Sequence, residues 1–313
     1  MRVAVLDIGT NSTRLLVADV DAQAGAVHEL ERESTVTRLG EGLERTGNLS
    51  EVAMGRVLAA LETYRPALEA LAPERRIAVL TSAARDAANG PDFTARVSEA
   101  FGVDARTIGG DLEARLSHLG ATAVQEAGSA GSAGEVVVLD IGGGSTEFIV
   151  ATDGVVGFHV STQAGVVRMT ERHIHHDPPL PEELEQVARD AQDVFGAAVP
   201  PQVHHPGATL IAVAGTATSM AAIDLALEPY DSERVHGHRV TLATCREILA
   251  RLAALPEARR RDVPGLHPQR AGTILAGAVF LIAAMELLGV SEMEVSEHDI
   301  LHGTAIAAAR GEL

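Results

Sequence analysis

The sequence contains no lysine, and all 25 of its basic residues are arginines. A phosphate-loop lysine, a Schiff-base lysine and a serine–lysine dyad are therefore excluded. A bound anion must be held by arginine, backbone N–H groups, hydroxyls or a metal ion. The formal net charge of -18 argues against a general nucleic-acid binder and against a protein that binds anionic membranes.

Cysteine is limited to Cys245, so no intrachain disulfide can form, which fits a reducing compartment. Asp7 interrupts the first apolar run, so no secretory signal pattern opens the sequence and we expect a cytoplasmic protein. The apolar stretch at 271–285 is shorter than the ~18–20 residues that span a bilayer, and Glu286 closes it. We expect this stretch to form a buried core helix.

A repeat organises the chain. "VLDIGTNST" occupies residues 5–13, and "VLDIGGGST" occupies residues 138–146, 133 positions later. Apolar residues flank both copies, so each predicts a strand, a tight turn and a second strand. With 313 residues and 46% apolar content, the chain can fill two cores. The segment at 126–135, rich in Gly, Ser and Ala, is the predicted domain junction.

Strands and helices alternate along both halves of the chain, which favours an α/β class with parallel or mixed sheets. Helices are expected at about 50–71, 268–288 and 299–309, among others. Pro66 lies within the first of these and is expected to kink or split it.

The two repeated turns have the chemistry of an anion site. Asp7 and Asp140 stand at the ends of buried strands, where a carboxylate must meet a metal ion, water or donors. The turns that follow direct several backbone N–H groups toward one spot, which suits a phosphate. An ordinary hairpin with a polar turn is the alternative for either copy alone. As a matched pair, one per domain, they predict two hairpins that grip a phosphate chain across a cleft, with a divalent cation between the two aspartates.

The order of motifs also resembles a known family. "VLDIGTNST", "VLDIGGGST" and "AGTATSMAAID" resemble the actin, sugar-kinase and acetate-kinase superfamily, whose two like domains clasp phosphates. With "TSAARDAAN", "GGDLEARLSHLG" and "SEHDIL", they more closely resemble the exopolyphosphatase and guanosine pentaphosphate phosphohydrolase family, over essentially the whole chain. The resemblance implies an α/β fold of two similar ribonuclease H-like (actin-like ATPase) domains, each a mixed sheet flanked by helices, with an interdomain cleft. The expected domains are residues 1–125, completed by the helix at 299–313, and residues 126–298.

The resemblance also assigns site residues. It implies that Glu113, in "GDLEA", is the base that activates water, and that Glu147 has a catalytic or metal-linked role. Nearby negative charge is expected to raise the pKa of Glu113. Asp7 and Asp140 are the expected ligands of Mg²⁺ (or Mn²⁺), and Arg85 is an expected phosphate ligand, with a surface salt bridge as the alternative. The other expected phosphate-binding residues are Gly9, Thr10, Asn11, Ser12, Gly142, Gly143, Gly144, Ser145, Thr146, Gly215 and Thr216.

Two histidine groups have metal-like spacing. One is "RHIHHD" at 172–177, and the other is His298 with His302, one helical turn apart. The sequence shows no third ligand for either group, so neither is expected to be a metal site.

The expected function is that of a magnesium-dependent hydrolase that removes terminal orthophosphate from inorganic polyphosphate. Hydrolysis of guanosine pentaphosphate to the tetraphosphate, a kinase of the same superfamily and a noncatalytic alarmone or nucleotide sensor are the alternatives. Longer relatives carry further helical domains, whereas this chain ends soon after "SEHDIL", so short polyphosphates are the expected substrates. No nucleic-acid or membrane partner is expected, and the resemblance implies a homodimer.

Overall fold

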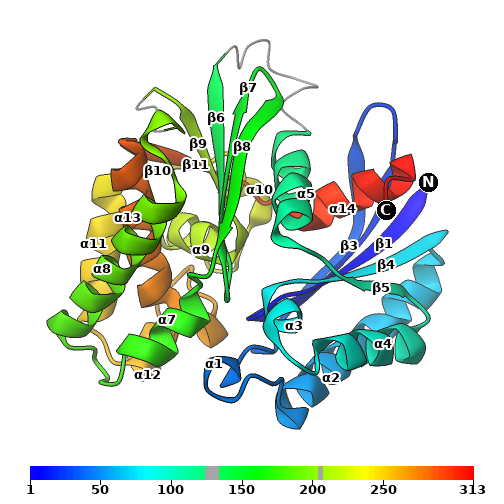
Figure 1. Ribbon diagram of the computed structural model, residues 1–313, viewed down its shortest axis with the longest axis horizontal. Helices are drawn as coiled ribbons and strands as arrows, with labels where there is room; N and C mark the ends of the chain where they lie inside the picture. The colour runs from blue at the N-terminus through cyan, green and yellow to red at the C-terminus, as the bar shows by residue number, and fades with distance from the viewer. Residues whose placement is uncertain (124–133, 204–206) are drawn as a thin grey trace. The chain divides into compact units, whose positions relative to one another are not determined.

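The computed structural model describes residues 1–123, 134–203 and 207–313, and it divides into two compact units (Figure 1). Unit 1 is Met1–Ala130 with His298–Leu313, and unit 2 is Gly131–Glu297. Residues 126–133 of the predicted junction lie outside the described residues. The C-terminal segment thus belongs to the unit that the N-terminal segment begins.

Unit 1 is built on a five-stranded mixed sheet with the strand order β3-β2-β1-β4-β5. Strand β1 pairs antiparallel with β2 and parallel with β4, which in turn pairs parallel with β5. The strands are β1 (Arg2–Ile8), β2 (Ser12–Val20), β3 (Val27–Val36), β4 (Arg75–Leu80) and β5 (Asp104–Thr107).

The sheet of unit 2 has the order β10-β11-β9-β6-β7-β8, and five of its strands repeat the order and directions of unit 1. A register shift falls between Val17 and Ala18 in unit 1 and between Val150 and Ala151 in unit 2, again 133 positions apart. The repeat seen in the sequence is therefore a structural duplication. The strands are β6 (Glu135–Ile141), β7 (Thr146–Thr152), β8 (Val155–Thr162), β9 (Thr209–Val213), β10 (Arg239–Thr241) and β11 (Glu292–Val295).

Helices cover both faces of the unit 1 sheet. Side chains alternate along β1, so that Leu6 and Ile8 face one apolar cluster while Val3 and Val5 face another. Helices α2 and α4 pack on the first face, and α5 and α14 pack on the second (Figure 1). The helices are α1 (Leu43–Thr46), α2 (Glu51–Leu71), α3 (Ser82–Asp86), α4 (Gly90–Phe101), α5 (Gly110–Thr122) and α14 (Ile300–Arg310).

In unit 2 a single apolar cluster joins the sheet to its helices. Phe195 lies at its centre and makes edge-to-face contacts with Phe148 and Phe280, with ring centroids 5.0 and 5.5 Å apart. The helices are α7 (Val166–His173), α8 (Pro181–Ala198), α9 (Ala214–Asp224), α10 (Ser232–Val235), α11 (Leu242–Ala253), α12 (Glu257–Arg260) and α13 (Ile274–Leu288), with single 3-10 turns at Pro201–Val203 and Pro268–Arg270.

Two helix predictions need correction. Helix α2 continues through Pro66 and is not split, because Leu61, Tyr64 and Leu68 bury the helix on both sides of the proline. The helix expected from residue 268 begins only at Ile274, after a 3-10 turn. Among the described residues, no helix is both long enough and apolar enough to cross a bilayer.

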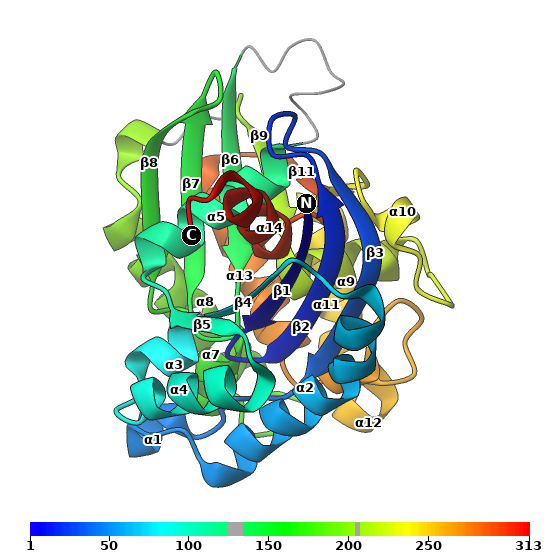
Figure 2. The same ribbon diagram turned by 90° about the vertical axis from the view of Figure 1, so that its right-hand side faces the viewer.

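Helices α5 and α14 lie side by side and cross with their backbones in contact (Figure 2). A Cβ atom on Gly120 would lie 1.8 Å from the carbonyl oxygen of Asp299, and one on Gly303 would lie 1.8 Å from that of Leu116. The two glycines therefore fix how closely α14, and Asp299 at its N-terminus, approaches the rest of unit 1.

We predict that Gly303→Ala lowers the free energy of unfolding by about 1–3 kcal/mol, because the helices must separate to admit the methyl group. Gly55→Ala is the matched control, since Gly55 is exposed within α2 and a Cβ there meets nothing within 4 Å. The control should raise stability by about 0.5–1 kcal/mol. Urea denaturation measures both, and equal stability of the two variants would contradict the close crossing.

Candidate active site

In unit 1 the predicted site residues gather at one edge of the sheet. Strands β1, β4 and β5 run parallel, so the segments that follow them emerge at the same edge. These segments are the turn after Asp7, helix α3 with Arg85, and helix α5 with Glu113. The topology thus brings together residues that are far apart in the sequence.

The turn between β1 and β2 is closed by a hydrogen bond from the Gly9 N–H to the Ser12 carbonyl, 2.9 Å long. The Asn11 carbonyl accepts hydrogen bonds from the N–H groups of Thr37 and Arg38, which holds the turn in place. Thr10 is 7% exposed, and its hydroxyl has no hydrogen-bond partner. A buried hydroxyl in this state costs free energy, which a phosphate oxygen at the turn would recover.

Asp7 forms an ion pair within its own hairpin, with Arg14, which also pairs with Asp299. The Arg14 Nε and Nη2 donate to Asp7 Oδ2 at 2.9 and 2.6 Å, and Arg14 Nη1 donates to Asp299. Burial raises the pKa of Asp7, and Arg14 opposes that rise. Burial alone would lower the pKa of Arg14, but Asp299 and Asp7 raise it above its usual range, so the guanidinium stays charged.

Glu113, the predicted base, is 7% exposed and pairs with Arg85, whose Nη1 lies 2.8 Å from Glu113 Oε2. Burial is the main cause that raises the pKa of Glu113, and the charge of Asp7 adds to it, while Arg85 and Thr81 lower it. We expected nearby negative charge to raise this pKa. The direction is as expected, but desolvation outweighs charge. Arg85 is 21% exposed at its side chain, so its salt bridge is not a surface one.

The turn between β6 and β7 repeats the geometry of the first, with a 2.9 Å hydrogen bond from the Gly142 N–H to the Ser145 carbonyl. The carbonyls of Gly142 and Gly143 accept from the N–H groups of Val166 and Val167 at the start of α7. Gly144 and Gly165 touch so closely that a Cβ on Gly165 would lie 2.4 Å from the Gly144 Cα. The hydroxyl of Thr146 donates to the Ala164 carbonyl, which assigns it to holding this loop.

Strand register distinguishes the two hairpins. Asp7 stands opposite Arg14 in unit 1, whereas Asp140 stands opposite Glu147 in unit 2. Directly opposite residues share one face of the sheet, so two carboxylates, 8% and 1% exposed, come together there. The Ser161 hydroxyl donates to Glu147 Oε1 at 2.7 Å. Paired carboxylates of this kind suit Mg²⁺, which prefers oxygen ligands.

Gly215 and Thr216 begin α9, directly after β9 and beside the Asp140 hairpin. Ala214 before them has a φ of 64°, a left-handed conformation that is strained for alanine. The Arg270 guanidinium packs against Gly215, where a Cβ would lie 2.8 Å from its Cζ, and Nη1 donates to the Gly215 carbonyl at 3.0 Å. The sequence reasoning did not identify Arg270, because nothing in the local pattern links it to residue 215.

The predicted residues therefore form two sets. Asp7, Arg85 and Glu113 lie together in unit 1, and Asp140 and Glu147 lie together in unit 2. The predicted cleft, and the cation between Asp7 and Asp140, would join the two units and stay predictions. Sequence reasoning did not predict that Arg14 pairs with Asp7 and with Asp299. The signal was in the repeat, where Arg14 occupies the position that Glu147 has in the second copy.

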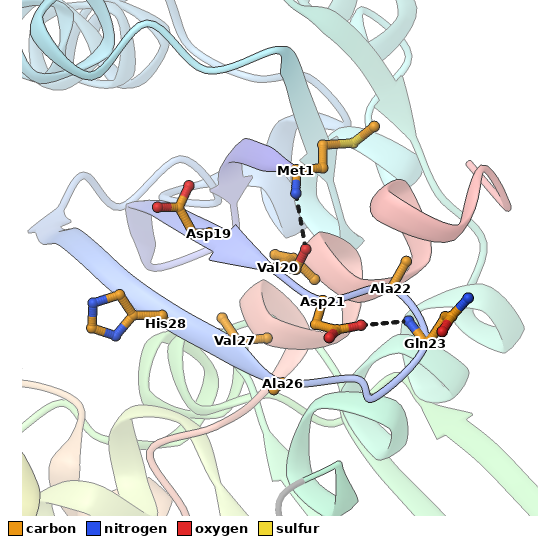
Figure 3. A pocket seen from close by; sticks show the side chains of 9 residues that line it. All are labelled: Met1, Asp19, Val20, Asp21, Ala22, Gln23, Ala26, Val27 and His28. Atoms are coloured by element: carbon orange, nitrogen blue, oxygen red, sulfur yellow. Dashed lines mark hydrogen bonds between the residues drawn. The ribbon is translucent and has the colours of Figure 1, made fainter.

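A hollow elsewhere in unit 1 contains none of the predicted residues (Figure 3). It has a volume of about 660 Å³ and is lined by Met1 and by the ends of β2 and β3, from Asp19 to His28. The Met1 ammonium donates to the Val20 carbonyl at 3.1 Å there. None of the residues that line this hollow is an arginine.

A family model described as the Ppx/GppA phosphatase family matches residues 16–309 of the sequence. The chain belongs to this family. Exopolyphosphatase 2 of Mycobacterium tuberculosis (strain ATCC 25618 / H37Rv) is 38% identical over 319 residues, which cover 98% of each chain.

Two solved structures are also similar. The Ppx/GppA family member of Aquifex aeolicus has a TM-score of 0.81 at 28% identity, over 100% of this chain and 98% of that one. An exopolyphosphatase from Cytophaga hutchinsonii has a TM-score of 0.88 at 25% identity, over 99% and 98%. The predicted family and the fold of two actin-like domains are confirmed, and this Ppx/GppA protein is a hydrolase of phosphoanhydrides.

The predicted role of Glu113 as the base, together with its raised pKa, predicts how hydrolysis by this Ppx/GppA protein depends on pH. A base must be ionised to accept a proton, so the acidic limb of kcat/KM should lie above the ~4.3 of an ordinary glutamate. Arg85→Gln removes the strongest influence that lowers this pKa, so the limb should move to higher pH. Rates measured from acidic to alkaline pH give the acidic limb of the unaltered protein and of Arg85→Gln. If the acidic limb of Arg85→Gln stays fixed or moves to lower pH, this result counts against Glu113 as the titrating group.

Proposed function

We propose that the protein is a magnesium-dependent exopolyphosphatase that releases orthophosphate from the end of inorganic polyphosphate, with Glu113 as the base. The observation that carries this proposal is the buried Glu113, which pairs with Arg85 and lies near enough to Asp7 for that charge to raise its pKa. A relative that aligns along nearly the whole chain bears the name Exopolyphosphatase 2, which supports polyphosphate as the substrate.

In the proposed reaction a water oxygen bonds to the terminal phosphorus while the bond from that phosphorus to the bridging oxygen breaks. Glu113 takes the proton of the water, and its raised pKa makes it a stronger base than an ordinary glutamate. Thr10 and the turn N–H groups would hold phosphate oxygens, and Arg85 would offset the charge that develops on them. The chain shortened by one phosphate leaves with the former bridging oxygen.

Asp140 and Glu147 are the residues that would hold Mg²⁺, since the register places the two carboxylates on one face. Such an ion would neutralise charge on the phosphates and help to orient them. Asp7 would contribute less negative charge to it, because Arg14 already pairs with Asp7. The cation therefore belongs mainly to unit 2 in this proposal, and the base belongs to unit 1.

Guanosine pentaphosphate ends in the same phosphoanhydride, so the same residues could cleave it. A kinase of the superfamily would need an acceptor hydroxyl and would not release orthophosphate into water. A noncatalytic sensor would bind these anions without turnover.

We predict that Glu113→Gln lowers kcat for polyphosphate by roughly 10²-fold or more, with an unchanged requirement for Mg²⁺. Glu147→Gln should instead raise the Mg²⁺ concentration that gives half-maximal rate, because it removes one of the two carboxylates. Titrating Mg²⁺ against the rate for each variant separates the two roles.

Asp111→Asn is the matched control, since Asp111 is an exposed carboxylate in the same first turn of α5. It should leave both kcat and the Mg²⁺ requirement near those of the unaltered protein. Near-normal kcat in Glu113→Gln would remove that residue from the mechanism, and an unchanged Mg²⁺ requirement in Glu147→Gln would remove the cation from the Asp140 hairpin.

We predict that kcat/KM for inorganic polyphosphate exceeds that for guanosine pentaphosphate. Orthophosphate release from polyphosphates of graded length and from the nucleotide, at equal concentrations of terminal phosphate, measures the preference. A higher value for the nucleotide would make the alarmone the substrate. Tight binding of either anion without release of orthophosphate would identify a sensor and overturn the enzymatic proposal.

A further inference from the structure

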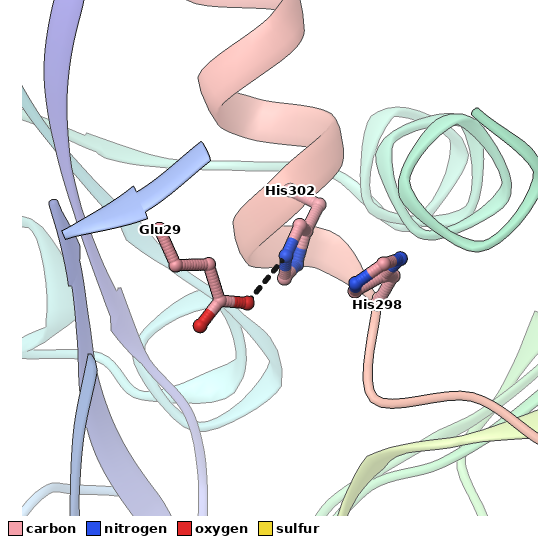
Figure 4. A group of neighbouring side chains, drawn as sticks. All are labelled: Glu29, His298 and His302. Atoms are coloured by element: carbon pink, nitrogen blue, oxygen red, sulfur yellow. Dashed lines mark hydrogen bonds and ion pairs between the residues drawn. The ribbon is translucent and has the colours of Figure 1, made fainter. Parts of the chain in front are cut away.

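We propose that Glu29, His298 and His302 form a second metal site, which takes a transition-metal dication such as Zn²⁺ and is separate from the proposed Mg²⁺ site. All three residues belong to unit 1 (Figure 4). Glu29 lies on β3, His302 lies in the first turn of α14, and His298 precedes that helix.

The three side chains converge. One ligand atom from each lies within 4.8 Å of the other two, and His302 Nε2 is 2.8 Å from Glu29 Oε1. The rings of His298 and His302 lie 4.2 Å apart between centroids, tilted by 37°. Figure 4 shows the His302 ring next to the Glu29 carboxylate and the His298 ring on the other side of His302.

His302 is a costly residue to bury in this position. It is 2% exposed, and its Nδ1 has no hydrogen-bond partner. The hydrogen bond to Glu29 accounts for one ring nitrogen and leaves the other without compensation.

Two imidazoles and a carboxylate are the donor set of many three-residue Zn²⁺ sites, in which water completes the tetrahedron. Tetrahedral ligands at ~2.1 Å from Zn²⁺ lie ~3.4 Å apart. The contact between His302 Nε2 and Glu29 Oε1, at 2.8 Å, must therefore lengthen by roughly 0.6 Å. Ligand atoms that lie up to 4.8 Å apart must approach by up to about 1.4 Å. Glu29 and His298 are both partly exposed, which permits this movement and gives water access. Nitrogen donors disfavour Mg²⁺ and Ca²⁺, which distinguishes this site from the Asp140 hairpin.

Such an ion would tie β3 to the N-terminus of α14. Asp299 lies between the two histidines in sequence, accepts from the Leu301 N–H and pairs with Arg14. The site therefore stabilises the segment that holds Arg14 in place. Its expected effect is on the stability of unit 1, and no step of hydrolysis requires it.

The test is titration of the full-length protein with Co²⁺ in buffer that contains Mg²⁺. Visible absorption of Co²⁺ should show saturable binding of one ion with nitrogen ligands, and Zn²⁺ should displace it. Glu29→Gln and His298→Gln should each weaken Co²⁺ binding by more than about 10-fold, since loss of a ligand exceeds loss of an outer-shell partner. Zn²⁺ should raise the Tm of the unaltered protein and not of these variants.

Two controls keep the result specific. His28→Gln changes an exposed histidine next to Glu29 on the same strand, and His175→Gln changes one in the other histidine group. Both should bind Co²⁺ like the unaltered protein. The proposal is overturned if the unaltered protein shows no saturable binding, if Glu29→Gln and His298→Gln bind as tightly as it does while circular dichroism shows them folded, or if His175→Gln abolishes binding.

Discussion

The buried guanidinium of Arg14 is the constraint on which unit 1 depends. It bridges Asp7 at the end of β1 and Asp299 at the start of α14, so it connects the first strand to the last helix of the chain. Both carboxylates are almost fully buried, and the removal of Arg14 would leave the two of them in the interior without this counterion. The close crossing of α5 and α14 at Gly120 and Gly303 brings Asp299 within reach of that ion pair.

The two copies of the hairpin differ at one position in a way that changes their charge. The register, the turn hydrogen bond and the bulge are the same in both copies, yet Arg14 in one corresponds to Glu147 in the other. An arginine opposite an aspartate makes a closed ion pair, which stabilises structure. A glutamate opposite an aspartate concentrates negative charge, which attracts a cation. In the proposed hydrolysis the first copy would thus support a base on a neighbouring helix, while the second would hold Mg²⁺.

Much of the fold and of the candidate site could be predicted from the sequence, because the repeat and the order of the motifs are local patterns. Sequence reasoning identified the hairpins and the C-terminal helix by these patterns, and it selected Glu113 as the predicted base. It failed where distant residues decide the outcome. Packing of Tyr64 and its neighbours keeps α2 continuous through Pro66, Gly215 admits the guanidinium of Arg270, and Glu29 meets two histidines near the other end of the chain. The pKa of Glu113 is raised mainly by burial, which no local pattern reveals.

The pairing of Glu113 with Arg85 also links substrate binding to base strength in the proposed hydrolysis. In the free protein Arg85 opposes the effect of burial, which raises the pKa of Glu113. A phosphate that accepts a hydrogen bond from Arg85 competes with Glu113 for the same donor and brings further negative charge. Both effects raise the pKa of the glutamate, because its partner is shared and its surroundings become more anionic. In the proposed hydrolysis Glu113 would therefore become a stronger base when a phosphate is present, because the arginine that lowers its pKa is shared with the substrate.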